Sequence, residues 1–243
     1  MSNESRGRKE LETDLQGIRA GRVLDAATGE GGFARFLADH LGSFEEIVGV
    51  DVLRPSDVPE SVFRQERIRF LETDAENLAF EDESFDTAAV SSSLHHFPDP
   101  SKVLGELWRV LRPGGRLIIH ETHCNVESEP ERTDMMLHHW VAEIDRLLDA
   151  YHAVTYSRDE ILRLAGRLRL SDVRVYNVRS NVSDPFDVEA VQSTERTIDR
   201  YLREATGLPG YPALREGASE LRRRLRGVGI QWEPEIFVIG LKP

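Results

Sequence analysis

Short apolar runs bounded by turn residues recur along the chain and predict seven β-strands. They cover residues 22–26, 46–51, 68–71, 86–91, 116–120, 172–178 and 235–241. The first five are apolar with little alternation, which is typical of strands covered on both faces. Helical patterns separate these strands, and strands that alternate with helices form parallel βαβ units. The pattern predicts an α/β fold with a doubly wound, mostly parallel seven-stranded sheet.

Apolar residues at helical spacing fill the gaps between the predicted strands. One helix follows the glycines at 29–32. Ser101 is the expected N-cap of another, which ends before the Arg-Pro-Gly-Gly sequence at 112–115 because proline and glycine stop helices. Residues 131–150 form one long helix, and Ser157 opens the next. The helices therefore lie where a doubly wound sheet requires them.

The length of 243 residues favours a single domain with one sizeable core. Residues 20–121 contain the regular alternation of strands and helices, and we expect them to form a cofactor-binding core. Residues 122–170 and 179–233 interrupt that regularity. We expect these two segments to be variable cap or insert segments around the sheet.

Charge and cysteine content narrow the class of partner. The chain has 43 acidic and 31 basic residues, a formal net charge of −12 that repels nucleic acid and anionic membranes. Cys124 is the only cysteine, so no intramolecular disulfide can form. The N-terminus lacks a signal-peptide core, and no apolar run is long enough to span a bilayer. We expect a cytoplasmic protein and, if the chain associates, a homodimer.

The sequence VLDAATGEGGF at 23–33 predicts a strand, a tight turn and a helix. Gly29 and Gly31 lie in the turn, where the absence of a Cβ lets a ligand approach the backbone closely. The free N–H groups at the start of the following helix would meet a negative or polar ligand group. This pattern alone fits nicotinamide and adenosyl cofactors equally well.

Acidic residues at or after the ends of three successive predicted strands sharpen the choice. Asp25 lies at the end of the first strand, Asp51 ends the second and Asp74 follows the third. The carboxylate of Asp51 can accept both hydroxyl protons of a ribose, and Asp74 lies beside the expected adenine position. The alternative is that each acid merely caps a strand or the next helix. The set as a whole favours an adenosyl cofactor.

At this point the chain resembles the class I S-adenosylmethionine-dependent methyltransferases. The motifs are VLDAATGEGGFA at 23–34, IVGVDV at 47–52, FLETDAENLAFEDESFD at 70–86, VSSSLHHFPDP at 90–100 and ELWRVLRPGGRLII at 106–119. A weaker similarity to the small-molecule branch of quinone-biosynthesis type extends to the C-terminus. The resemblance implies a Rossmann-like methyltransferase fold, with S-adenosylmethionine as cofactor and S-adenosylhomocysteine as its product.

The resemblance also implies which residues hold the cofactor. They are Asp25, Ala27, Gly29 and Gly31 for the methionyl part, Asp51 for the ribose, Asp74 for the adenine amino group, Val52 and Ala75 for the adenine pocket, and Ser91 and Ser92 near the methionine. The family prefers glycine at the position of Ala27. The extra methyl group should narrow the loop slightly and affect affinity.

Histidines are the candidates for acid–base chemistry. Methyl transfer is an in-line displacement at a sulfonium, so the protein mainly aligns the reactants and a base is optional. His95 and His96 follow the fourth strand, at the sheet edge where ligands bind, and either could remove a proton from the acceptor. The alternative is that the pair packs and forms hydrogen bonds without taking part in the chemistry.

A second histidine-containing run raises the question of a metal. His120, His123 and Cys124 are ligand-type residues, and His138 and His139 could add a nitrogen. However, His120 is expected to complete a buried strand, and the reaction does not require a metal. We therefore expect no metal site.

The helix at 131–150 carries Met135, Met136 and Trp140, an adaptable apolar surface that could cover an acceptor pocket. The alternative is that Trp140 is simply a core residue. Because the cofactor motifs end before residue 120, we expect acceptor specificity to reside in residues 122–156 and 179–233.

Two other functions share the same fold class. A nicotinamide-dependent oxidoreductase often carries a Tyr-x-x-x-Lys pair, and none of the three lysines follows a tyrosine at that spacing. A catalytically silent binding protein stays open as an alternative. A base-amino methyltransferase of nucleic acids would carry Asn-Pro-Pro or Asp-Pro-Pro where residues 91–94 read Ser-Ser-Ser-Leu. A small-molecule acceptor is therefore expected.

Overall fold

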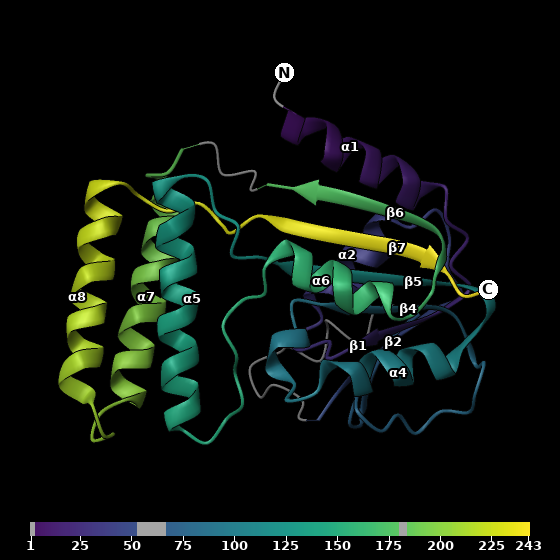
Figure 1. Ribbon diagram of the computed structural model, residues 1–243, viewed down its shortest axis with the longest axis horizontal. Coiled ribbons are helices and arrows are strands. Elements are labelled where there is room, and N and C mark those ends of the chain that lie inside the picture. Colours follow the sequence, from purple (N-terminus) through teal and green to yellow (C-terminus); the bar gives the residue numbers. More distant parts are fainter. Residues whose placement is uncertain (1–2, 53–66, 180–183) are drawn as a thin grey trace.

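The computed structural model describes residues 3–52, 67–179 and 184–243. In this part of the chain one seven-stranded sheet forms the centre (Figure 1). Its strands are β1 Arg22–Ala26, β2 Glu46–Asp51, β3 Ile68–Glu72, β4 Phe85–Ser91, β5 Leu111–Thr122, β6 Ser171–Val178 and β7 Glu235–Leu241. The order is β3-β2-β1-β4-β5-β7-β6, with β7 antiparallel to both neighbours and the other pairs parallel. The predicted α/β sheet is confirmed.

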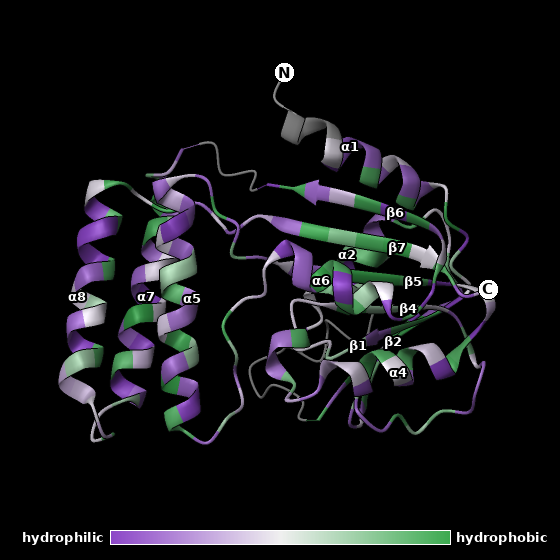
Figure 2. Cartoon of the chain, in the orientation of Figure 1, coloured by the Kyte–Doolittle hydropathy of each residue, from purple (hydrophilic) through white to green (hydrophobic). Residues whose placement is uncertain are grey.

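Helices cover both faces of the sheet. The helical elements are α1 Asn3–Gln16, α2 Gly32–His40, the short 3-10 helix η1 Leu94–His96, α4 Pro100–Val110, α5 Glu129–Leu147, α6 Arg158–Gly166, α7 Val188–Glu204 and α8 Tyr211–Gly227. Residues of α1 and α2 form one hydrophobic cluster with the sheet, and residues of α4 and α6 form another. This double cover explains the continuous apolar runs of the central strands, which Figure 2 shows as hydrophobic.

The junction between α4 and β5 differs from the sequence prediction. The helix ends at Val110 and the strand begins at once, so residues 112–115 belong to β5 instead of forming a helix-stop loop. Gly114 has a left-handed φ of 74°, and its N–H donates to the carbonyl of Lys242. Backbone hydrogen bonds to the residues after β7 thus extend β5 through residues 112–115, whose local propensity favours a turn.

Side-chain caps mark the first residues of several helices. The N-cap of α4 is Asp99, which accepts the N–H of Ser101 at 3.0 Å, so the prediction of Ser101 as N-cap is wrong by two residues. Ser157 caps α6 as predicted, in a capping box with Glu160. The predicted helix at 131–150 is α5, shifted to Glu129–Leu147. None of the described helices is long and apolar enough to cross a membrane.

Helices α5, α7 and α8 form a three-helix bundle beside the sheet (Figure 1). The bundle has its own hydrophobic cluster, which includes Leu137, Trp140, Ile144, Ile198, Leu214, Leu221 and Leu225. Trp140 is 7% exposed, and its indole N–H donates to the carbonyl of Leu214 at 3.0 Å. Trp140 is therefore a core residue of the bundle, which decides between its two interpretations.

The structure divides the first of the two predicted cap segments. Of residues 122–170, α5 joins the bundle, whereas α6 packs on the sheet through Ile161 and Ala165. The second segment, 179–233, contributes α7 and α8 to the bundle. Residues 180–183 of that segment lie outside the described residues.

Candidate active site

The carboxyl ends of β1, β2, β4 and β5 lie at one edge of the sheet. At this edge the chain order reverses, because β1 pairs with β2 on one side and with β4 on the other. Asp25 of β1 is in register with Gly49 of β2 and Ala89 of β4. In open α/β sheets a ligand binds in the crevice outside such a reversal. The residues that follow β1 and β2 therefore define the candidate site.

The loop after β1 turns through three residues in the left-handed region. The φ values are 54° for Ala27, 50° for Gly29 and 76° for Gly31. A Cβ added to Gly29 would meet no atom of the described residues within 4 Å, so these residues leave space beside the loop there. The left-handed conformation is unfavourable for a residue with a Cβ, so it costs Ala27 about 1 kcal/mol of conformational free energy. This conformation explains why glycine is preferred at its position.

Asp25 is fully buried behind this loop. Its Oδ2 accepts the hydroxyl proton of Thr28 at 2.6 Å, and the N–H of Ala34 lies near the carboxylate, whereas its buried Oδ1 makes no hydrogen bond of good geometry with any described residue. Burial raises the pKa of Asp25 to about 7. Gly49 leaves room for Thr28, because a Cβ there would lie 2.8 Å from the Thr28 hydroxyl. A buried carboxylate oxygen without a donor is costly, and a ligand N–H or O–H would satisfy it.

Asp51 connects the end of β2 to the glycine loop. Its Oδ2 accepts the N–H of Gly29 at 2.9 Å, and its Oδ1 accepts the N–H of Val52 at 2.8 Å. Each carboxylate oxygen has a second lone pair, so Asp51 can still accept hydroxyl protons from a ligand. Val52 is 57% exposed beside it and offers an apolar surface.

Asp74 and Ala75 follow β3 and have different environments. Asp74 is exposed, and one carboxylate oxygen accepts the N–H of Glu76 at 2.8 Å. Ala75 is buried in the hydrophobic cluster of the sheet. The Asp74 carboxylate is therefore accessible to a ligand, whereas the side chain of Ala75 is largely covered by protein.

The ends of β4 and β5 are joined by hydrogen bonds. The hydroxyl of Ser91 lies 2.7 Å from Nδ1 of His120, and the N–H of Ser92 donates to the His120 carbonyl at 2.9 Å. The His120 ring stacks on Phe237, with 4.3 Å between ring centroids. Ser92 has a left-handed φ of 44°. The chain thus turns sharply after β4, directly beside the glycine loop.

Glu121 is a candidate base by residue type, and the structure gives it a positioning role that the sequence did not predict. Its carboxylate is fully buried and accepts the N–H groups of Ser93 and Leu94 at 2.8 and 2.7 Å. The other oxygen faces Nδ1 of His95 at 3.1 Å. Glu121 thereby fixes η1 against the end of β5. The signal in the sequence is an acid directly after a buried strand, one residue beyond the partner of Ser91.

Comparison with known proteins agrees with this geometry. Residues 24–119 match the family described as "Methyltransferase domain". The cofactor-binding core belongs to the class I S-adenosylmethionine-dependent methyltransferases. The chain is 41% identical over 103 residues to demethylmenaquinone methyltransferase of Thermus thermophilus, a match that covers 41% of this chain and 46% of the relative. The chain thus spans about half the length of the curated relatives that it matches.

Solved structures show the same fold along the whole chain. YcgJ of Bacillus subtilis is 23% identical with a TM-score of 0.57, over 98% of both chains. Phosphoethanolamine N-methyltransferase 2 of Haemonchus contortus, solved with S-adenosylhomocysteine, is 20% identical with a TM-score of 0.56. That match covers 98% of this chain and 52% of the other. The predicted methyltransferase fold is confirmed, the bundle included.

Four histidines gather where the methyltransferase core meets the bundle. His95 and His96 come from η1, His138 from α5, and His152 from the segment between α5 and α6. In five of the six ring pairs, all except His96 with His138, the centroids lie 4.1 to 5.4 Å apart. Desolvation by the packed rings, followed by the neighbouring histidines, lowers the pKa of His96 to about 3. His138 and His152 had not been connected with His95 and His96 by sequence reasoning.

The run of His120, His123 and Cys124 does not converge on one point. These three residues are not among the groups of described side chains that could hold one metal ion together. Among the described residues, the three that could together hold a metal ion are His95, His96 and His152. The fold therefore brings ligand-type residues together at a place other than this run.

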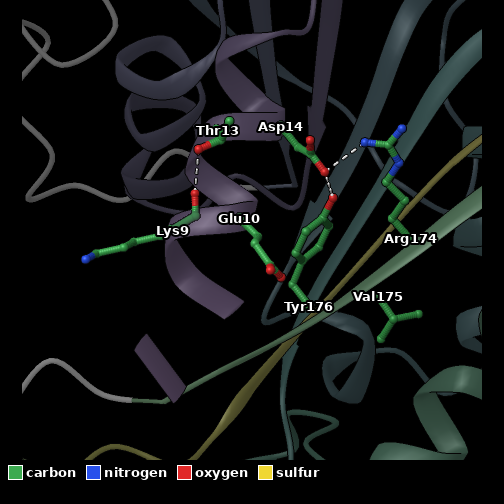
Figure 3. Close-up of a pocket in the computed structure, with 7 residues that line it drawn as sticks. All are labelled: Lys9, Glu10, Thr13, Asp14, Arg174, Val175 and Tyr176. Atoms are coloured by element: carbon green, nitrogen blue, oxygen red, sulfur yellow. Dashed lines mark hydrogen bonds and ion pairs between the residues drawn. The ribbon is translucent and has the colours of Figure 1, made fainter. Parts of the chain in front are cut away.

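A surface hollow at the far edge strand is a separate feature (Figure 3). It lies between α1 and β6, where Asp14 accepts the hydroxyl proton of Tyr176 and an N–H of Arg174. The Tyr176 hydroxyl and then Arg174 hold the pKa of Asp14 below its ordinary value. These groups satisfy one another, and β6 lies at the opposite end of the sheet order from β2 and β3. The hollow is therefore not the active site.

Proposed function

We propose that the protein transfers the methyl group of S-adenosylmethionine to a small-molecule acceptor. The observation that carries the proposal is the glycine loop, which has space beside it among the described residues and is backed by an unpaired, buried oxygen of Asp25. Relatives over the same part of the chain are named as demethylmenaquinone methyltransferases, and one structural neighbour was solved with S-adenosylhomocysteine. These features support the methyltransferase function over a nicotinamide-dependent one.

The residues at the sheet edge fit the parts of this cofactor. Asp51 would accept the ribose hydroxyls, and Oδ1 of Asp25 would accept a donor from the methionyl end beside Ala27, Gly29 and Gly31. Asp74 would face the adenine amino group, and Val52 would cover the adenine ring. The remaining positions inferred from the resemblance are Ala75 at the adenine pocket and Ser91 and Ser92 near the methionine. When bound, the cofactor supplies a methyl group on a sulfonium.

Alignment is the main task of the protein in such a reaction. An in-line displacement at a sulfonium needs the acceptor atom held on the side of the methyl group opposite the sulfur. Glu121 contributes by fixing η1, the turn that directly follows β4, against the end of β5. Because the cofactor is already activated, correct placement accounts for much of the rate gain.

The acceptor would bind between the sheet edge and the bundle. The bundle is built from the two segments in which we expect acceptor specificity, whereas the family match ends at residue 119. Loops and inserted helices can vary there without disturbing the parallel strands. The acceptor atom of the small molecule would be oxygen, nitrogen or carbon.

Proton transfer by His95 or His96 stays a prediction with little support. Nδ1 of His95 is engaged by Glu121, which leaves Nε2 alone to meet an acceptor. Desolvation and the neighbouring histidines lower the pKa of His96, which weakens it as a proton acceptor even though its side chain is exposed. A base is optional in this reaction, and an acceptor that is already nucleophilic needs none.

We propose that the protein acts in the cytoplasm and that any self-association gives a homodimer. The single cysteine of the sequence suits a reducing compartment, and Cys124 is only partly exposed. Sedimentation equilibrium tests the oligomeric state, and fractionation of the source cells tests the location.

A transfer experiment tests the proposed function. The untagged protein would be incubated with methyl-labelled S-adenosylmethionine and a library of quinols, phenols, amines and carbon acids, and products would be identified by mass spectrometry. We expect label in at least one small molecule, and much less transfer by the Asp51→Ala variant when the cofactor is below saturation. Failure of every acceptor class, with tight cofactor binding retained, would favour the silent binding protein instead.

A further inference from the structure

We propose that the four histidines at the junction of sheet and bundle form a binding site for a divalent transition-metal ion of the zinc type. His95, His96 and His152 are the primary ligands, and His138 completes the site. This site does not depend on the proposed function, because the evidence for it lies in the histidine geometry alone.

The distances between ligand atoms suit a common ion. One ring nitrogen from each of His95, His96 and His152 lies within 4.8 Å of the others. Nε2 of His138 lies 3.1 Å from Nε2 of His152. In a tetrahedral zinc site with bonds of about 2.1 Å, neighbouring nitrogens lie about 3.4 Å apart. Small side-chain rotations therefore suffice to bring the nitrogens into a coordination shell.

The other nitrogens of three rings are oriented by carboxylates. Nδ1 lies 3.1 Å from Glu121 in His95, 3.2 Å from Glu233 in His138 and 2.7 Å from Asp145 in His152. An ionised carboxylate only accepts hydrogen bonds, so each Nδ1 carries the proton. Each Nε2 is then left with a lone pair. Histidine ligands of metal ions are oriented in this same way by an acidic partner.

This proton placement leaves a conflict that a cation resolves. With protons on both Nδ1 atoms, the Nε2 lone pairs of His138 and His152 face each other at 3.1 Å. Two acceptors at that distance repel, unless a proton or a metal ion lies between them. A shared proton would bridge only His138 and His152, whereas a metal ion could also coordinate His95 and His96. The three carboxylates around the cluster balance the charge of the ion.

The ligands come from separate parts of the fold, so the ion would join them. His95 and His96 belong to η1 at the sheet edge, His138 belongs to the bundle, and His152 lies in the connection between α5 and α6. Ala153 already donates its N–H to the carbonyl of His95 at 2.8 Å, which holds this connection against η1. A bound ion would fix the bundle against the edge that holds the cofactor. The sequence-based expectation of no metal site is replaced here.

Cobalt titration tests the site directly. The untagged, chelator-treated protein would be titrated with Co²⁺ and followed by visible absorption, with Zn²⁺ as competitor and Mg²⁺ as the hard-cation control. We expect the spectrum of four-coordinate Co²⁺, a dissociation constant in the micromolar range or tighter, displacement by Zn²⁺, and no effect of Mg²⁺.

Variants assign the ligands. His96→Gln changes an exposed side chain, so folding should be preserved while Co²⁺ affinity falls at least tenfold. His152→Gln should likewise lower Co²⁺ affinity at least tenfold. Asp145→Asn should weaken Co²⁺ binding about ten- to a hundredfold, because the Asp145 carboxylate orients the His152 ring. His40→Gln is the matched control, because His40 bonds to Phe36 within α2.

Two results would overturn the site. One is Co²⁺ binding weaker than about 1 mM, which is an interaction of only about 4 kcal/mol. The other is tight binding that is the same in the wild type, His96→Gln and His152→Gln. In either case His138 and His152 share a proton, and the cluster is a hydrogen-bonded contact between bundle and sheet.

Discussion

Two buried polar side chains, Trp140 in the three-helix bundle and Asp25 in the sheet core, differ in how completely their polar atoms are paired. In the bundle, the indole N–H of Trp140 is paired with the carbonyl of Leu214, inside a hydrophobic cluster. In the core, the fully buried Asp25 keeps one oxygen without a partner among the described residues, behind a loop that has space beside it. The polar group of Trp140 is thus satisfied within the bundle, whereas Oδ1 of Asp25 could still accept a hydrogen bond from a ligand. The difference supports the proposal that the ligand binds at the sheet core.

The largest expected effect belongs to the bundle. Trp140→Ala should lower the free energy of unfolding by about 3–5 kcal/mol, because it leaves a large cavity among α5, α7 and α8. Urea unfolding followed by circular dichroism measures it. Trp232→Ala is the control, since that side chain is 39% exposed and should change stability far less. Equal losses in the two variants would contradict the assignment of Trp140 to the bundle core.

Asp51→Ala should weaken S-adenosylmethionine binding by about 2 kcal/mol, roughly thirtyfold, through the loss of charge-assisted hydrogen bonds. Calorimetry measures the affinity, and Asp39→Ala, an exposed acid on α2, should leave it unchanged. Asp51→Asn keeps one carbonyl oxygen for the N–H of Gly29, so its affinity should lie between those of the wild type and Asp51→Ala. An unchanged affinity in Asp51→Ala would mean that Asp51 does not hold the ribose.

Cofactor affinity should depend on pH through Asp25. The pKa of this carboxyl is raised by burial to about 7, and its ionised form attracts a cationic ligand donor much more strongly than its neutral form does. Affinity should therefore rise about tenfold from pH 6 to pH 8. The stability of the free protein should move the other way, falling as pH rises from about 4 to about 7, because the unfolded carboxyl ionises first.

The Asp25→Asn variant is the control for this pH dependence. Asparagine has nearly the same shape and does not titrate in this range, so the pH profile of binding should be flat apart from any titration of the ligand itself. Calorimetry at pH 6, 7 and 8 on both proteins makes the comparison. Identical profiles would remove Asp25 from the binding site.

The smallest expected effects on the free energy of unfolding come from replacing two helical glycines by alanine. The two replacements should have opposite signs. A Cβ at Gly217 would lie 2.8 Å from the Trp140 ring, so Gly217→Ala should destabilise the bundle by about 1 kcal/mol or more despite the better helix propensity. Gly105→Ala in α4 meets nothing within 4 Å and should stabilise by about 0.5–1 kcal/mol. Thermal unfolding of the two variants shows whether the signs differ.

The core was largely predictable because its signals are local. A parallel strand buried on both faces shows a continuous apolar run, and Asp25, Gly29 and Asp51 follow such runs directly. Boundaries were less predictable where distant chain took part. The β5 strand begins at Leu111 because the chain end pairs with residues 114 and 115, which no local pattern reveals.

The junction with the bundle could not be predicted for a related reason. His95 and His152 are far apart in sequence and meet only after α5 has packed on α7 and α8. Glu121 likewise gains its role from η1, a turn of three residues with no periodicity of its own. Sequence patterns report which face of an element is buried, and they do not report which distant element covers it.

Calorimetry with the cofactor on the untagged protein tests the central claim most directly, with NAD⁺ and NADH as the competing ligands. The arrangement of Asp25, Gly29 and Asp51 predicts one site per chain for S-adenosylmethionine and for S-adenosylhomocysteine, with micromolar dissociation constants and no binding of either nicotinamide. No heat and no thermal shift with both adenosyl ligands, or tighter binding of a nicotinamide, would contradict it.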